Sequence, residues 1–128
     1  MDIRHIEIPP IDLNWSEWHE WGKFLRDARS DPNGIILPDE SGVYEAKLVN
    51  VEKRLTIGKA SNLRMRVKQG LVKGKVPHSS GKDIREKENT AQVVIRWAVT
   101  IKPAAVEEEL HRLYIEIFGE LPKYTDRT

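Results

Sequence analysis

Residues 55–70 read LTIGKASNLRMRVKQG, and this stretch decides how the chain is expected to fold. The apolar run LTI predicts a β-strand, and Gly58 ends it. Ser61 or Asn62 can then cap a helix that we expect to continue to about Leu71. Basic residues alternate with apolar ones along that helix. The stretch therefore predicts a strand, a glycine turn and a basic helix in immediate succession.

The composition indicates one folded domain. The chain has 128 residues, which is enough for one hydrophobic core and too few for two. Apolar residues make up 39% of it and four are Trp, which disfavours disorder. The absence of Cys excludes disulfides and thiolate metal sites. No apolar run approaches the roughly 20 residues of a membrane span, and residues 1–10 lack the apolar core of a signal peptide, so we expect a cytoplasmic protein with no membrane partner.

The overall net charge of +1 conceals a strong asymmetry. The segment 53–87 holds eleven Lys and Arg against Asp83 and Glu86, which gives it a net charge of +9. The other ten basic and 18 acidic residues leave −8 on the rest of the chain. So basic a segment suits a polyanion, because Lys and Arg neutralise phosphates and release counterions. The alternative is a solvated helix face followed by a basic loop.

Apolar periodicity and turn residues predict the remaining elements. They are an extended arm at 6–13, a Trp-rich helix at 15–28, a hairpin with strands at 43–48 and 54–57, a short helix at 82–88, a strand at 92–100 and a final helix at 103–118. This order predicts an α/β fold with a small three-stranded mixed β-sheet flanked by helices and an added N-terminal helix. The arm and the Trp-rich helix (1–39) would pack on a single globular unit (40–128).

The final helix offers three adjacent carboxylates, Glu107, Glu108 and Glu109. Its apolar stripe is expected to consist of Val106, Leu110, Leu113 and Ile117. At 100° per residue Glu108 would point away from that stripe into solvent. Glu107 and Glu109 would flank it, where either carboxylate could reach a site at the edge of the sheet.

Four segments between residues 40 and 126 form an ordered set. Gly42–Tyr44 reads GVY, Thr56–Gly58 reads TIG, Gly58–Val67 reads GKASNLRMRV, and residues 119–125 read GELPKYT. They resemble, in this order, the GIY and YIG elements of GIY-YIG nucleases, the GKAxNLxxRV segment of UvrC-type excision nucleases and the GxLPxxN ending of restriction-type members. The resemblance implies a GIY-YIG nuclease fold and a small stand-alone endonuclease.

The same resemblance implies a mechanism for metal-dependent hydrolysis of DNA. Tyr44 would be the general base, Arg66 and Lys59 would hold the phosphate, and Glu107 would bind Mg²⁺ or Mn²⁺. The family spacing, with Pro four residues before the glutamate and Leu three after, selects Glu107. A tyrosine has an ordinary pKa of about 10, so it can act as a base only where nearby cations favour its phenolate. A single carboxylate completed by waters and substrate oxygens suits Mg²⁺.

Further positions carry weaker expectations from the resemblance. Thr56 stands at the family's second motif tyrosine, Gly70 where a histidine often follows the arginine by four residues, and Thr125 at the terminal asparagine. His78, in VPHSSGKDIR, resembles a His-Ser-x-Gly-Lys segment and could orient water or contact phosphate. The expected contacts to the DNA backbone are Arg64, Lys68, Lys73, Lys75, Ser80, Lys82 and Arg85.

Other interpretations remain open at this stage. Tyr44 could be an ordinary strand aromatic, and the chain a catalytically inactive nucleic-acid-binding module that keeps the fold. It could also be a protein-interaction domain that exposes an apolar patch around Trp15, Trp18 and Trp21. Duplex DNA is the expected partner, and a homodimer is the form that double-strand cutting would favour. The resemblance suits an intracellular protein of a prokaryotic or phage-like system.

Overall fold

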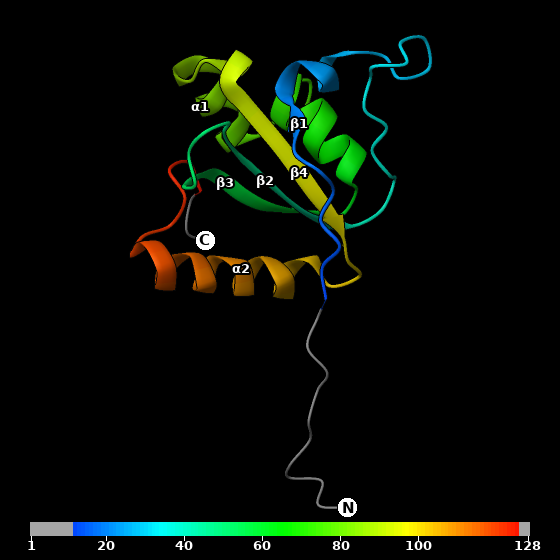
Figure 1. Cartoon of the computed structure of the whole chain (residues 1–128). Coiled ribbons are helices and arrows are strands. Elements are labelled where there is room, and N and C mark those ends of the chain that lie inside the picture. The colour runs from blue at the N-terminus through cyan, green and yellow to red at the C-terminus, as the bar shows by residue number, and fades with distance from the viewer. Residues whose placement is uncertain (1–11, 126–128) are drawn as a thin grey trace, which may run out of the picture.

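One antiparallel sheet organises the computed structural model, which describes residues 12–125 (Figure 1). Its strands are β1 (His19–Glu20), β2 (Gly42–Leu48), β3 (Arg54–Ala60) and β4 (Val93–Val99), in the spatial order β1-β4-β2-β3. The predicted α/β class is confirmed. The predicted three-stranded mixed sheet is wrong in both strand number and direction, because β4 lies antiparallel between β1 and β2.

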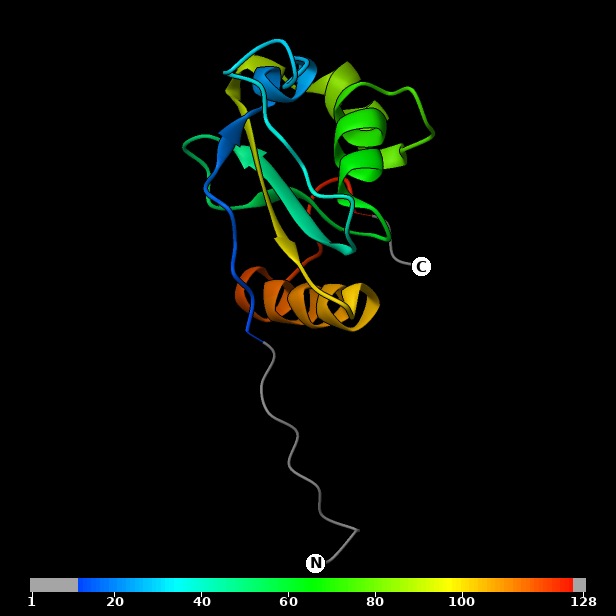
Figure 2. The same ribbon diagram turned by 90° about the vertical axis from the view of Figure 1, so that its right-hand side faces the viewer.

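Helical segments cover both faces of this sheet. They are the 3₁₀ turns η1 (Trp21–Leu25) and η3 (Thr90–Gln92), the π-helix η2 (Arg64–Val72), and the α-helices α1 (Ser79–Lys87) and α2 (Pro103–Phe118). Figures 1 and 2 show α2 crossing one face, while η2 and α1 lie on the other. As predicted, α2 begins at Pro103 and ends at Phe118, where it is capped by Gly119 in the left-handed conformation with φ 77°.

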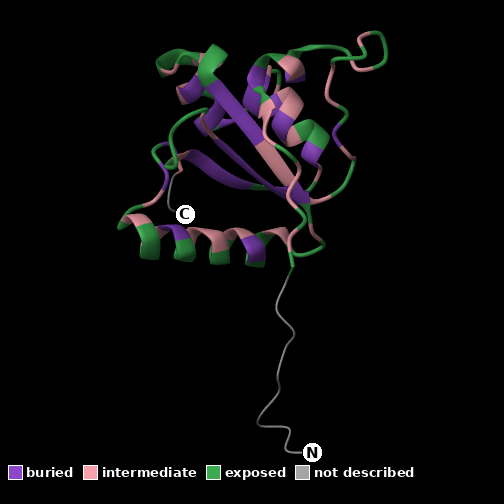
Figure 3. Cartoon of the chain, viewed as in Figure 1, coloured by how far each residue is buried: buried purple, intermediate pink, exposed green. Residues whose placement is uncertain are grey.

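The hairpin of β2 and β3 sends alternate side chains to two separate cores. Tyr44 and Ala46 point into the larger core, which η1, η2 and α1 complete. Val43 points to the opposite face and packs there with Ala98 of β4 and Val106 of α2. Because the sheet is covered on both faces, most residues of its central strands β2 and β4 are buried (Figure 3).

The predicted helix at 15–28 is wrong. Residues 15–20 run extended along β4, where the Ser16 amide donates to the Trp97 carbonyl and the Trp97 amide donates to Ser16 Oγ, and only Trp21–Leu25 are helical, as the 3₁₀ turn η1. Trp15 and Trp18 are partly buried against the guanidinium of Arg96, and Trp21 is buried in the larger core. Contacts with β4 and with the larger core thus determine the conformation of this segment, although the spacing of its tryptophans favours a helix. The described residues also lack the predicted exposed patch of three Trp side chains; the arm expected at 6–13 lies mostly outside them.

Helix α2 packs only the first half of the predicted stripe, Val106 and Leu110, against the sheet. Val106 and Tyr114 are buried, whereas Leu113 is 41% and Ile117 is 73% exposed. Tyr114 replaces them as the inward residue because its hydroxyl accepts a hydrogen bond from the Arg54 amide at 3.0 Å. Glu107, next to Val106, flanks this inward row as predicted and is partly buried, whereas Glu109 is exposed.

Gly58 leaves the space that the Tyr44 ring occupies. The two residues are direct partners across β2 and β3, and a Cβ at Gly58 would lie 2.4 Å from the Tyr44 hydroxyl oxygen. Because Tyr44 is only 2% exposed, its ring has no room to retreat. We expect Gly58→Ala to lower the free energy of unfolding by about 1–3 kcal/mol in chemical denaturation. Gly22→Ala, where nothing lies within 4 Å of the added methyl, is the control, and equal stability of the two variants would contradict this packing.

Candidate functional site

All six residues expected to be catalytic line one open groove of about 1320 Å³. They are Tyr44, Thr56, Lys59, Arg66, His78 and Glu107. The groove lies between the end of β3, the start of η2, the loop that precedes α1, and the first turns of α2. Residues that span more than sixty positions of sequence are thus brought to one surface.

Tyr44 and His78 form the buried end of the groove. The Tyr44 hydroxyl lies 2.7 Å from His78 Nε2, and the Gly81 amide donates to His78 Nδ1 at 3.0 Å. An amide N–H can only donate, so Nδ1 of the neutral ring must accept and Nε2 must carry the proton. His78 therefore donates a hydrogen bond to the Tyr44 oxygen. This hydrogen bond stabilises the phenolate form of Tyr44.

Burial works against ionisation of both rings. Desolvation raises the pKa of Tyr44 to about 12, and the charge of Glu107 adds to this rise while Arg66 opposes it. Burial also lowers the pKa of His78 to about 4, helped by the positive charges of Arg66 and Arg85. At neutral pH the pair is therefore a protonated tyrosine held by a neutral histidine.

Two cations border this pair. Arg66, from the π-helix η2, donates to the Pro77 carbonyl at 3.3 Å and is partly exposed to the groove. Lys59 is exposed at the end of β3. A π-helix is an uncommon segment that is often found at functional sites. An anion that entered the groove would meet a planar donor fork from Arg66 and a point charge from Lys59.

Glu107 is the partly buried carboxylate of the groove. Among residues 12–125 it makes no ion pair and no side-chain hydrogen bond, and it is half-buried on the inward side of α2. Glu108 is exposed at the rim of the same groove, and Glu109 is paired with Arg112. The described part of the chain contains no group of three or more metal-ligating side chains, so a cation here would need oxygens from water or substrate.

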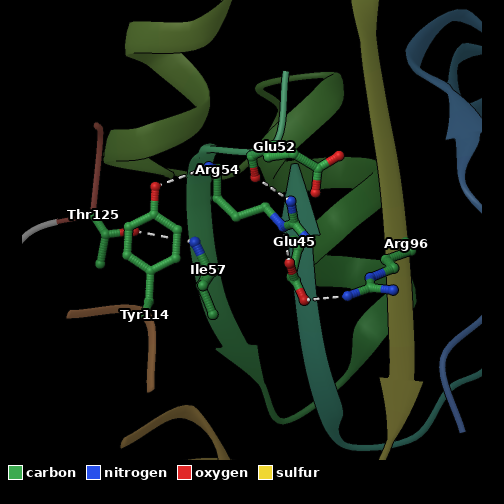
Figure 4. Close-up of polar contacts among 7 residues, drawn as sticks. All are labelled: Glu45, Glu52, Arg54, Ile57, Arg96, Tyr114 and Thr125. Carbon is green, nitrogen blue, oxygen red and sulfur yellow. Dashed lines mark hydrogen bonds and ion pairs between the residues drawn. The ribbon is translucent and has the colours of Figure 1, made fainter. Parts of the chain in front are cut away.

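The C-terminal segment closes the groove beside β3. Thr125 Oγ1 accepts from the Ile57 amide at 3.1 Å and lies 3.1 Å from Thr56 Oγ1, and Figure 4 draws its contact with Ile57. Thr56 donates to Ser80 Oγ at 3.2 Å, and Ser80 donates to the Tyr124 carbonyl at 2.7 Å. Thr56, Ser80 and Thr125 thus form a hydroxyl network that joins β3, α1 and the tail.

The residues expected to contact the DNA backbone are distributed unevenly. Arg85 donates to the Gly70 and Leu71 carbonyls, Lys68 donates to the Arg26 carbonyl, and Arg64 pairs with Asp39. The contacts of Arg85 and Lys68 connect η2 to other parts of the fold, and the ion pair of Arg64 lies on the surface of η2. Lys75 and Lys82 are exposed, Lys73 is partly exposed, and all three lie outside the residues that line the groove.

His111 is a groove residue that the sequence analysis did not identify. It lies one helical turn after Glu107, and its Nε2 is 3.0 Å from the Ile57 carbonyl. The resemblance assigns a role only to the glutamate on this helix, so it gave no reason to select the histidine. The signal that could have found it is the spacing of four residues between Glu107 and His111, which places both on one helix face.

The buried His78 should make folding sensitive to acid. The unfolded ring has a pKa of about 6.5 and the folded one a pKa of about 4, so below pH 6.5 the unfolded chain takes up the proton first. We expect protonation of His78 in the unfolded chain to lower the free energy of unfolding by about 3 kcal/mol as the pH falls from about 6.5 to 4. Urea denaturation at several pH values should show the stability difference between wild type and His78→Gln shrinking over this window. A stability difference between the two proteins that does not change with pH would contradict a neutral buried imidazole.

No protein-family model, curated protein or solved structure matches the chain. Within residues 12–125, none of the helices has the length and apolar content needed to cross a membrane.

Proposed function

We propose that the chain is a metal-dependent endonuclease of the GIY-YIG type that hydrolyses phosphodiester bonds in duplex DNA. The observation that carries the proposal is that Tyr44, Lys59, Arg66 and Glu107 line one groove. These are the positions at which the sequence resembles the family's catalytic motifs. The order of the elements, a hairpin followed by a basic helix, a strand and a final helix, also supports it.

The surroundings of Gly70 offer a second support. Family members often carry a histidine four residues after the arginine, where this chain has Gly70. His78 packs against that glycine, since a Cβ on Gly70 would lie 3.3 Å from His78 Cδ2. We infer that His78, supplied by the loop before α1, occupies the space of the missing histidine and serves Tyr44 in its place.

The chain's own residues would divide the reaction as follows. Arg66 and Lys59 bind the phosphate and oppose the negative charge that grows in the transition state. Tyr44 takes a proton from the attacking water once its phenolate is favoured by the donated hydrogen bond of His78 and by the charge of Arg66. Glu107 holds the divalent cation, which when bound would neutralise charge on the phosphate and the leaving oxygen. The free carboxylate of Glu107 at the groove is the observation that fits such a cation.

Cleavage of supercoiled plasmid in Mg²⁺ or Mn²⁺ tests the proposal. We expect nicked or linear products that disappear with EDTA, with Tyr44→Phe and with Glu107→Gln. Glu116→Gln is the matched control, because Glu116 lies on the exposed side of the same helix and pairs with Arg112 at 3.1 Å. Linear products at the earliest times would favour a homodimer that cuts both strands. An intact plasmid under every condition, with branched DNA and RNA also uncut, would refute the nuclease.

A nucleic-acid-binding module without turnover is the second candidate. The raised pKa of Tyr44 favours it, because a phenol with a pKa of about 12 has almost none of its phenolate, the form that acts as a base, at neutral pH. This candidate predicts DNA binding that needs no metal and weakens steeply with salt. It also predicts that Glu107→Gln binds DNA as well as wild type or slightly better, whereas neither protein cleaves it.

A further inference from the structure

Glu107 and His111 lie on the same face of α2. They are four residues apart, so their Cβ atoms are roughly 5–6 Å from each other, and both line the groove. One contributes a carboxylate and the other an imidazole. The resemblance to GIY-YIG nucleases assigns a role to the glutamate position and none to the histidine.

A hydrogen bond to the backbone fixes which ring nitrogen of His111 carries the hydrogen. The Ile57 carbonyl can only accept, so Nε2 must carry the hydrogen of the 3.0 Å contact between them. In the neutral ring Nδ1 then has a free lone pair, and among residues 12–125 it makes no side-chain hydrogen bond. Ile57 is itself held, because its amide donates to Thr125 Oγ1.

This arrangement is typical of metal-binding histidines. Such rings almost always donate their second N–H to a carbonyl or a carboxylate, which fixes the tautomer and orients the lone pair. Here the partner is a backbone carbonyl of β3, a rigid strand at the edge of the groove. The Nδ1 lone pair of His111 is thus available to a cation. The carboxylate of Glu107 is available too, because it makes no ion pair within the described chain.

We propose that Glu107 and His111 together form a divalent-cation site with one oxygen and one nitrogen ligand, which prefers Mn²⁺ and similar first-row metals to Mg²⁺. The inference rests on the proposed function in taking Glu107 as the metal residue. Mg²⁺ favours oxygen ligands and retains its waters, whereas an imidazole suits later divalent metals. Water and phosphate oxygens would complete the coordination.

Direct binding measurements test the site without relying on cleavage. Calorimetric titration with MnCl₂ and MgCl₂ should show that His111→Gln weakens Mn²⁺ binding by about tenfold or more and Mg²⁺ binding by less than about twofold. Glutamine keeps an N–H for the Ile57 carbonyl but lacks the imidazole nitrogen. Glu107→Gln should weaken both metals. His19→Gln is the control, since His19 stacks on Trp97 away from the groove.

A second measurement needs no variant. In proton NMR spectra of the wild-type protein, substoichiometric Mn²⁺ should broaden the ring signals of His111 well before those of His19. Unchanged Mn²⁺ affinity in His111→Gln, equal losses for both metals, or broadening that spares His111 would overturn the proposal.

The two proposals can fail separately. If Mn²⁺ binding requires both residues but no nucleic acid is cut, the cation site stands and the nuclease fails. If plasmid cleavage requires Glu107 but His111→Gln leaves the Mn²⁺ affinity unchanged, the nuclease proposal stands and this inference fails.

Discussion

Arg66→Ala is expected to lower the rate of plasmid cleavage by about 10²–10³-fold, which is the range found when one preorganised donor to a transition-state charge is removed. Arg66 lies in the groove near Tyr44, where its charge opposes the rise in the tyrosine pKa. The substitution should therefore act twice, by removing a phosphate donor and by making the phenolate harder to form. Cleavage rates measured over a range of pH should show both effects.

Arg64→Ala is the matched control on the same helix. Arg64 is exposed, lies outside the groove lining and pairs with Asp39 at 2.6 Å. We expect its removal to weaken DNA binding modestly and to leave the rate at saturating DNA nearly unchanged. Thermal unfolding should show both variants close to wild type, because Arg66 is partly exposed and its bond to the Pro77 carbonyl is long, at 3.3 Å. Equal rates for the two variants would contradict the special role of Arg66.

Glu45→Ala is expected to lower the free energy of unfolding by about 3–5 kcal/mol, the range for breaking a buried ion pair by removal of one partner. The Glu45 side chain is 5% exposed and pairs with Arg54 and, at 2.9 Å, with Arg96 (Figure 4). Trp18 lies over both guanidiniums, with its ring centre 5.0 Å from Arg54 and 4.6 Å from Arg96. Without the carboxylate, two adjacent positive charges would remain largely shielded from water.

Glu120→Ala controls for the loss of a surface carboxylate. Glu120 pairs with Lys53 at 3.2 Å, and both side chains are more than half exposed, so we expect a loss of at most about 1 kcal/mol. Guanidinium denaturation would compare the two variants. A Glu45→Ala protein as stable as Glu120→Ala would mean that the arginines separate without penalty once the carboxylate is absent.

Most elements with strong local signals were predicted close to their observed bounds, because apolar runs, turn residues or caps lie within the segment itself. They are the strand at 42–48, the basic helix, the strand at 93–99 and the helix Pro103–Phe118. The predicted turn at Gly58 is wrong, because β3 continues through Gly58 to Ala60 in its pairing with β2. Pairing of β2 with β3 brings Tyr44 beside Gly58, and the elements that follow carry Arg66 and Glu107 to the same groove. Much of the candidate site was therefore accessible from sequence.

The remaining features depend on partners that are distant in sequence. The segment around Trp15 and Trp18 is extended because β4 supplies amide partners and Arg96 supplies a cation for both rings. On α2, Tyr114 is the inward residue because its hydroxyl accepts a hydrogen bond from the Arg54 amide. Neither contact produces a periodic pattern in the sequence, so the pattern predicted a helix for the Trp segment and wrongly placed Leu113 and Ile117 inward on α2.

The covered edges of the sheet limit how two copies of the protein could associate. At the outer edge of β3, the Lys123 and Tyr124 amides donate to the Arg54 and Leu55 carbonyls, and Thr125 accepts from the Ile57 amide. The opposite edge strand, β1, is only two residues long. Neither edge offers a long template for strand addition, which protects the monomer from edge-to-edge aggregation. A homodimer of this chain would therefore assemble through helices or loops rather than by extending the sheet.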